Sequence, residues 1–366
     1  MRLDIDGRNC ELESGRSILD AVKKEGLDSI MLSDRPLAAQ IGGEVFNLRF
    51  TPKKDTQIHL LRYGEDMGRR VYERTLQFLF ILAMRKEFPR ARVCVRYSLG
   101  PGLFITVDGM EEPFNEEAAL KVETEMRRLV RLKLPLERRR ISIKEALSFY
   151  EQDGQADKAK LLKWRRFSYF DVYQIDGYMD YFYGEMAPDT SYADVFRVKY
   201  VHDGAVVLLM PRNDAPDVPS DYVDLPKLHA VFHQSDEWGK LMECATVNDL
   251  NTHIQNGTIR ELVRINEALH DRGYADIADK IVQKGAKAVL VAGPSSSGKT
   301  TSAHRISTQL RLQGCHPVML SLDDYYIDRD KIERDENGEI DLENINTLDI
   351  QRFGSDLAAL IRGEKV

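Results

Sequence analysis

The sequence has little of what would place it in a specialised class of protein. Its four cysteines, Cys10, Cys94, Cys244 and Cys315, lie far apart and form no C-x-x-C pair, which argues against a disulfide framework or a cysteine zinc site. The longest apolar run, Phe78–Met84, is far shorter than the ~20 residues that span a bilayer. The residues after Met1 lack the apolar core of a signal peptide. We therefore expect a cytoplasmic protein with reduced thiols and no membrane contact.

The composition is that of an ordinary globular chain. Of its 366 residues, 43% are hydrophobic and 30% are charged, and a net charge of −7 gives no general attraction to nucleic acid. At roughly 100–200 residues per domain, this length predicts two or three domains. The pattern of strands and helices predicts a multidomain fold that is α+β in its first part and α/β in its last.

A glycine- and serine-rich loop carries the clearest chemistry. The apolar run Ala288–Ala292 leads into a loop that fits the pattern G-x-x-x-x-G-K-[ST], and a helix is expected to follow. In such a loop the backbone N–H groups surround phosphate oxygens, while Lys299 reaches the β/γ-phosphates and the Thr300 hydroxyl ligates Mg²⁺. The predicted ligands are therefore ATP and Mg²⁺. The predicted phosphate-binding residues are Gly293, Pro294, Ser295, Ser296, Ser297, Gly298, Lys299, Thr300 and Thr301.

A motif of acidic and aromatic residues follows the glycine- and serine-rich loop, after one predicted helix and one predicted strand. The predicted helix 300–312 stops at Gly314, and residues 316–322 read as a second buried strand. This β-α-β order predicts a partial P-loop NTPase sheet with parallel strands. The motif SLDDYY (321–326) would then lie at the edge of the sheet that faces the ligand.

GPSSSGKTT followed by SLDDYY resembles the uridine kinase branch of the phosphoribulokinase/uridine kinase family. The resemblance implies that Asp323 is the general base on a 5′-hydroxyl, and that Tyr325 or Tyr326 lines the nucleoside site. Asp341, in the stretch EIDLE (339–343), would bind ribose hydroxyls. Two alternatives stay open: Asp323 or Asp324 only holds Mg²⁺ or caps a loop, and Asp341 lies on a surface strand after the turn at 337–338.

The kinase-like part begins near residue 286, and the sequence ends about eighty residues later at Val366. The resemblance implies that lid and base-recognition residues lie beyond that point. We therefore expect a truncated kinase domain, whose activity and preferred nucleoside this sequence leaves open.

The first 225 residues carry a second resemblance. Residues 1–62 follow the strand, strand, helix, strand order of a β-grasp module and resemble the TGS domain of threonyl-tRNA synthetases. Residues 63–225 resemble the additional domain that follows TGS in those enzymes, where H-x-x-x-H and C-x-x-x-H pairs edit mischarged tRNA. The corresponding positions here are Arg74, Phe78, Phe182 and Met186, which cannot supply that chemistry, so an inactive scaffold is expected.

Two clusters of polar residues are interpreted as ordinary surface. One comprises seven cations: Arg127, Arg128, Arg131, Lys133, Arg138, Arg139 and Arg140. Glu123, Glu125 and Glu137 offer partners at helical spacing, and no aromatic residues interleave, so a solvated flank is favoured over an RNA-binding face. His229 and His233 are four residues apart but lack an H-E-x-x-H pattern, which favours packing or surface roles over a metal site.

Residues 226–285 are expected to be a helical linker, with Gly273 separating two of its helices, and the kinase-like part occupies 286–366. The predicted function is ATP-dependent phosphoryl transfer to a nucleoside, with uridine as the first candidate. Two other readings stay open: an RNA-binding or regulatory protein with a nucleotide-sensing loop, and a kinase of another small molecule. The oligomeric state is not predicted.

Overall fold

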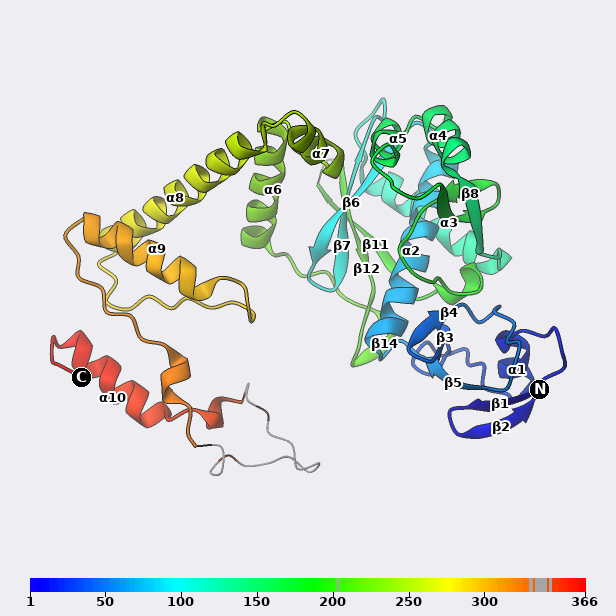
Figure 1. Cartoon of the computed structure of the whole chain (residues 1–366), viewed down its shortest axis with the longest axis horizontal. Coiled ribbons are helices and arrows are strands. Elements are labelled where there is room, and N and C mark those ends of the chain that lie inside the picture. The colour runs from blue at the N-terminus through cyan, green and yellow to red at the C-terminus, as the bar shows by residue number, and fades with distance from the viewer. Residues whose placement is uncertain (203, 329–331, 333–340, 342–343) are drawn as a thin grey trace. The chain divides into compact units, whose positions relative to one another are not determined.

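The chain divides into two compact units in the computed structural model, residues 1–249 and residues 250–366, and each is described by itself (Figure 1). The structure describes residues 1–202, 204–328, 332, 341 and 344–366. Helices and several small sheets occur together, so the chain is a multidomain α+β protein, as predicted. Among the described residues, no helix combines the length and apolarity needed to cross a membrane.

A five-stranded sheet with the strand order β2-β1-β5-β3-β4 forms the start of the first unit. β1 runs parallel to β5, and the other neighbours are antiparallel. Helix α1 (Ile18–Lys24) begins at Ser17, whose hydroxyl accepts from the N–H of Asp20 while the Asp20 carboxylate accepts from the N–H of Ser17. Ser17 and Asp20 therefore form a capping box. The strands are β1 (Arg2–Ile5), β2 (Arg8–Glu11), β3 (Ala38–Ile41), β4 (Glu44–Phe46) and β5 (Thr56–Leu61).

Helix α2 (Asp66–Glu87) supplies much of the main core of the first unit. Its apolar run packs with residues from α3 and from two further sheets, whose strand orders are β11-β12-β7-β6 and β10-β9-β8. These strands are β6 (Arg92–Leu99), β7 (Gly102–Asp108), β8 (Glu137–Ser142), β9 (Tyr169–Ile175), β10 (Tyr178–Asp180), β11 (Arg197–His202) and β12 (Ala205–Leu209), and a short hairpin joins β13 (Pro211–Arg212) to β14 (Ala215–Pro219). The helices are α3 (Glu116–Leu132), α4 (Ile143–Gln152), α5 (Ala156–Leu162), α6 (Pro226–Leu241), α7 (Val247–Gln255) and the 3-10 turn η1 (Thr190–Tyr192).

The second unit begins at Leu250, inside α7, and its longest helix is α8 (Ile259–Gln283). The prediction that Gly273 separates two helices is wrong, because α8 continues through it. An interior glycine costs only about 1 kcal/mol relative to alanine, which a helix of this length and packing outweighs. The remaining elements are α9 (Lys299–Leu312), α10 (Ile350–Ile361) and the 3-10 turns η2 (Leu322–Tyr325) and η4 (Ile345–Thr347).

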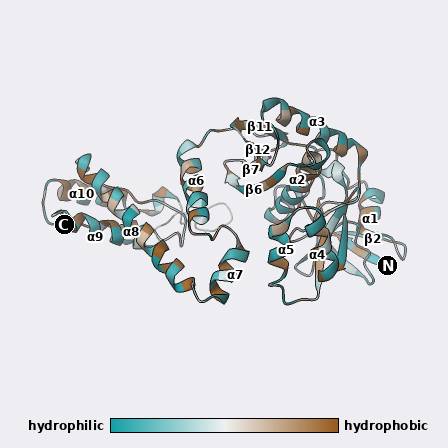
Figure 2. Ribbon diagram, turned by 90° about the horizontal axis from the view of Figure 1, so that it is seen from above, coloured by the Kyte–Doolittle hydropathy of each residue, from teal (hydrophilic) through white to brown (hydrophobic). Residues whose placement is uncertain are grey.

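Helices α8 and α9 pack together through a small apolar cluster. Ile306 and Leu310 of α9 are buried with Ala278 of α8. The ribbon of α8 alternates between hydrophobic and hydrophilic residues, as expected of a helix with one packed face (Figure 2). Gly314 closes α9 with a φ of +80°, which confirms the predicted stop.

In the described residues of the second unit, the predicted parallel sheet is not present. Among residues 286–328, which the structure describes completely, neither 288–292 nor 316–322 forms a strand. Leu290 is 86% exposed and Val318 is 66% exposed, although both were expected to be buried. A parallel strand needs a hydrogen-bonded neighbour and helices over both of its faces, and neither apolar run has that cover here.

Candidate functional site

The predicted phosphate loop, residues 293–298, lies immediately before α9. Ser296 and Gly298 adopt left-handed backbone conformations, with φ of 58° and 84°. Gly293 is tightly fitted, because a Cβ added there would lie 2.7 Å from the hydroxyl oxygen of Ser297. Gly298 is the N-cap of α9 and provides no capping side chain. The first turn of α9 therefore has no side-chain cap for its N–H groups.

Lys299 is the first residue of α9 and folds back over the loop. Its ammonium donates hydrogen bonds to the carbonyl oxygens of Gly293 and Pro294, at 2.9 Å each. Thr300 and Thr301 follow in the first turn and are exposed, as are Pro294, Ser295 and Ser297. The predicted loop residues thus lie at the N-terminus of α9, and the Lys299 ammonium lies over them.

Polar contacts to α8 hold α9 in place behind the loop. The hydroxyls of Tyr274 and Ser302 lie 3.2 Å apart, and Arg305 pairs with Asp271 at 2.9 Å. These contacts were not predicted, because helical periodicity marks apolar faces and does not identify polar partners on separate helices.

The acidic motif lies on η2 and has an exposed carboxylate. The N–H of Asp323 donates to the hydroxyl of Ser321 at 3.3 Å, and both Asp323 and Asp324 are exposed. Among the described residues, no hydrogen bond or ion pair joins the Asp323 carboxylate to the phosphate loop. The loop and the acidic motif are thus two separate exposed elements of the second unit.

The two tyrosines of the motif have different surroundings. The Tyr325 hydroxyl donates to Asp356 at 3.0 Å, and its ring meets Phe353 edge-on at 5.2 Å, so Tyr325 is buried against α10. Tyr326 is 45% exposed and is the better placed of the two to meet a ligand. Asp341 is exposed, but residues 339, 340, 342 and 343 of its motif, and the predicted turn at 337–338, lie outside the described residues.

The four positions predicted to correspond to the synthetase editing residues lie together in the first unit. The rings of Phe78 and Phe182 are 5.3 Å apart, and Phe78 and Met186 are fully buried. Arg74 donates from Nε to the carbonyl oxygen of Glu185 at 2.9 Å. Burial lowers the pKa of the Arg74 guanidinium. Apolar side chains and an arginine therefore fill this place, which leaves no imidazole or thiolate for catalysis.

The arginine cluster is largely paired with acids. Arg127 binds Glu123 at 2.7 Å and Arg128 binds Glu125 at 2.6 Å, which confirms two of the predicted helical partners. The remaining paired arginines use residues from elsewhere in the chain: Arg138 contacts Asp171 and Glu185, Arg139 contacts Gln174, and Arg140 contacts Asp171. These pairs support the interpretation of the cluster as a solvated flank.

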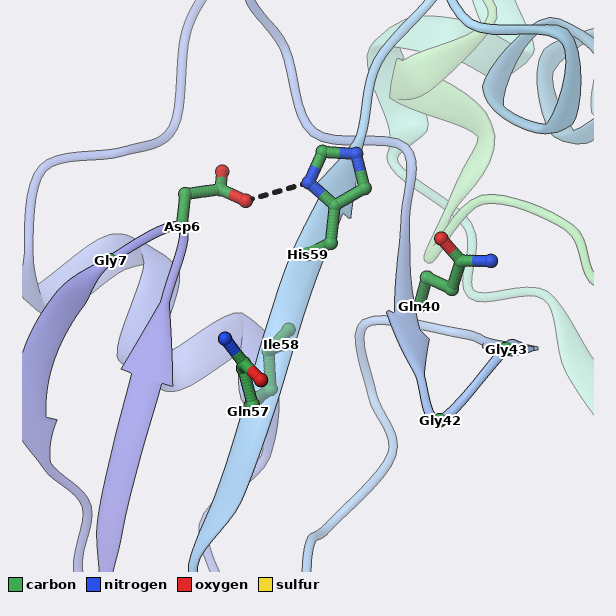
Figure 3. A pocket seen from close by; sticks show the side chains of 8 residues that line it. All are labelled: Asp6, Gly7, Gln40, Gly42, Gly43, Gln57, Ile58 and His59. Atoms are coloured by element: carbon green, nitrogen blue, oxygen red, sulfur yellow. Dashed lines mark hydrogen bonds and ion pairs between the residues drawn. The ribbon is translucent and has the colours of Figure 1, made fainter.

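A shallow cavity of about 480 Å³ opens on the five-stranded sheet (Figure 3). At its rim the imidazole of His59 lies 2.8 Å from a carboxylate oxygen of Asp6 and 2.6 Å from one of Glu65. The hydrogen bonds to Glu65 and Asp6 raise the pKa of His59. Burial alone would raise the pKa of Asp6, but hydrogen bonds from His59, the Leu60 amide and Arg62 lower it overall. Glu65 is the N-cap of α2, so His59 ties this helix to the turn after β1.

This arrangement predicts a pH-dependent contribution to stability. The pKa of His59 is raised in the folded state, so its stabilisation is fully present below about pH 6.5 and is lost as the pH rises through the raised value. The free energy of unfolding of wild type should exceed that of His59→Gln, and this difference should shrink on going from about pH 6 to pH 9. The difference should stay below about 1 kcal/mol, because the His59 side chain is 48% exposed. Urea unfolding followed by tryptophan fluorescence measures this difference, since Trp164 and Trp238 both lie in the first unit. A difference that grows with pH would contradict the raised pKa of His59.

No family model matches the chain. About half of it is distantly similar to bacterial threonine–tRNA ligases. The ligase of Clostridium kluyveri is 25% identical over 194 residues, which are 53% of this chain and 30% of the ligase. That of Carboxydothermus hydrogenoformans is 27% identical over 175 residues, or 46% of this chain and 26% of the ligase. The ligase of Acetivibrio thermocellus is 28% identical over 160 residues, which are 43% of this chain and 24% of the ligase. The matches thus span less than a third of the length of these relatives.

Proposed function

We propose that the second unit binds MgATP and transfers its γ-phosphoryl group to the 5′-hydroxyl of a nucleoside, with uridine as the first candidate. We further propose that residues 1–62 are a TGS-like β-grasp domain and that residues 63–225 are an additional domain of the threonyl-tRNA synthetase type, without editing chemistry of its own. The resemblance of the later motifs to uridine kinases supplies the reaction and the acceptor.

The geometry of the phosphate loop carries this proposal. Left-handed residues at 296 and 298 precede an uncapped helix terminus, and the Lys299 ammonium lies over the loop at hydrogen-bonding distance from two of its carbonyls. Phosphate oxygens attract this ammonium more strongly than carbonyl oxygens do, because charged acceptors form the stronger hydrogen bonds. The loop thus offers a cation and exposed backbone donors to one anionic ligand.

The roles of the other predicted site residues follow from the chemistry of their side chains and from whether these side chains are exposed. Thr300 would hold Mg²⁺ through its hydroxyl, and Asp323 would accept the proton of the attacking hydroxyl. Both side chains are exposed. Tyr326 and Asp341 would contact the nucleoside, whereas Tyr325 would support the motif through Asp356 and Phe353.

Replacing Lys299 by alanine should weaken the binding of MgATP by about 10–100-fold, which corresponds to one charged hydrogen-bonding interaction. Isothermal titration calorimetry of the chain with MgATP measures this change. Lys287→Ala is the matched control, because Lys287 is exposed and lies just before the loop. If wild type and Lys299→Ala bind MgATP with equal affinity, the loop does not bind the nucleotide.

The similarity to threonine–tRNA ligases favours a second candidate function, in which the first unit binds RNA and the loop only senses nucleotide. Binding of tRNA to the chain should then fall steeply with salt, because each phosphate contact releases counterions. No binding at low salt would discard this function. A panel of nucleosides and sugar phosphates, assayed for ADP release, separates uridine from the acceptors of phosphoribulokinase-like enzymes.

A further inference from the structure

Two imidazoles from separate elements of the first unit form a hydrogen bond where α6 lies against the sheet β11-β12-β7-β6. The Nε2 atoms of His202, at the end of β11, and His229, on α6, are 3.3 Å apart. Such a bond needs one ring to carry a proton on Nε2 and the other ring to present a lone pair there. The contact between these two elements therefore depends on how many protons the two rings hold together.

Helix α6 rests on the sheet mainly through aromatic rings. His229 meets Phe104 of β7 edge-on at 4.9 Å, and Phe232 stacks on Tyr97 of β6 at 4.2 Å. The structure describes every residue of α6, and none of them is buried; Val231, for example, is 62% exposed. Because α6 buries so little apolar surface, a change in charge at one contact is enough to alter its docking.

The number of protons on the two rings decides whether they attract or repel each other. When one ring is charged, it still donates to the lone pair of its neutral neighbour. When both are charged, each Nε2 carries an N–H, so the hydrogen bond is lost and two positive charges face each other. His233 lies one turn beyond His229, with ring centroids 6.3 Å apart, and adds a third charge when it is protonated. Acid therefore works against the docked position of α6.

The other ionisable groups around His229 do not cancel this repulsion. Burial, His202 and His233 lower the pKa of His229, and Asp224, in the segment before α6, raises it by less. Tyr97 stays neutral, because burial raises the pKa of its hydroxyl. The charges that act on Tyr97 and His233 are those of Arg96, Asp236 and Glu237. Since the pKa of His229 is lowered in the folded state, its contribution to docking is complete above about pH 6.5 and is lost as the pH falls through the lowered value.

We propose that the His202–His229 pair is a proton-controlled latch, which holds α6 on the sheet at neutral pH and releases the helix when both rings are protonated. Release uncovers the aromatic face that Tyr97 and Phe104 form beneath α6. The latch involves no residue of 286–366, so it does not depend on the proposed phosphoryl transfer.

Hydrogen exchange of the whole chain, read by mass spectrometry, tests the proposal, because the amides of a detached helix exchange faster. From about pH 7.5 to about pH 5.5, the protection of α6 peptides, corrected for the intrinsic pH dependence of exchange, should fall about tenfold or more. Peptides from α2 in the same sample should keep their protection, since α2 lies in the main core. His59 cannot cause this loss, because its raised pKa makes it more stabilising at low pH.

His202→Gln and His229→Phe each leave one imidazole at the contact, so each should abolish the acid response. Glutamine accepts a hydrogen bond from a charged His229, and phenylalanine keeps an aromatic ring against Phe104. The matched control is His270→Gln, which removes an exposed histidine on α8 and should respond to acid as wild type does.

Wild-type α6 that is equally protected at both pH values overturns the proposal. A loss of wild-type size in a variant whose α6 is protected at the higher pH overturns it as well. If α6 of one variant is unprotected at both pH values, the other variant decides, because the two changes lie on different elements.

Discussion

Asp323→Asn should lower kcat for nucleoside phosphorylation by about 10²–10⁴-fold, the usual contribution of a general base. Asparagine keeps the size and hydrogen-bonding capacity of the side chain but cannot accept the proton of the attacking hydroxyl. The affinity for MgATP should stay within about twofold, because the Asp323 carboxylate makes no hydrogen bond or ion pair with the phosphate loop in the described part of the chain. The kcat of the chain, together with any natural sequence that follows Val366, is measured by coupled ADP release with saturating uridine.

Asp324→Asn is the matched control for this prediction. The two aspartates are adjacent on η2 and both are exposed, so the same change at each removes one exposed carboxylate. A large effect at Asp323 alone identifies it as the base. A loss at Asp324 with normal turnover in Asp323→Asn would assign the essential carboxylate to the second aspartate instead. If both lose activity and both need more Mg²⁺, the pair holds the metal.

Local features of this fold could be predicted from the sequence because their causes lie within a few residues. The capping box at Ser17 and Asp20 depends on side chains only three positions apart. The stop of α9 depends on the single glycine at 314. The helix that follows the phosphate loop begins within one residue of its predicted start, because Gly298 marks its N-cap.

Features that depend on a distant partner could not be predicted in this way. The apolar run at 288–292 has the composition of a buried strand, but composition does not reveal whether a second strand lies beside it. Gly273 resembles a helix stop, yet the same residue is tolerated inside a long packed helix. The pairing of Arg138 with Glu185, and the approach of His202 to His229, arise only when separate elements fold together.

Phe78→Ala should destabilise the first unit by about 3–5 kcal/mol, the usual cost of removing a buried phenylalanine and leaving a cavity. Phe78 is completely buried and contacts the rings of Phe182 at 5.3 Å and Tyr178 at 5.9 Å. Helix α2 thus uses this position for packing. Urea unfolding followed by tryptophan fluorescence reports the loss.

Tyr183→Ala is the control, because Tyr183 belongs to the same loop region as Phe182 but is 75% exposed. An exposed aromatic leaves little cavity when it is truncated, so the free energy of unfolding should change by no more than about 0.5 kcal/mol. Comparable losses in both variants would mean that the loop, rather than the packed interior around Phe78, limits stability. A Phe78→Ala protein as stable as wild type would mean that the interior has room to collapse, and that this position is not the packed core that the buried rings indicate.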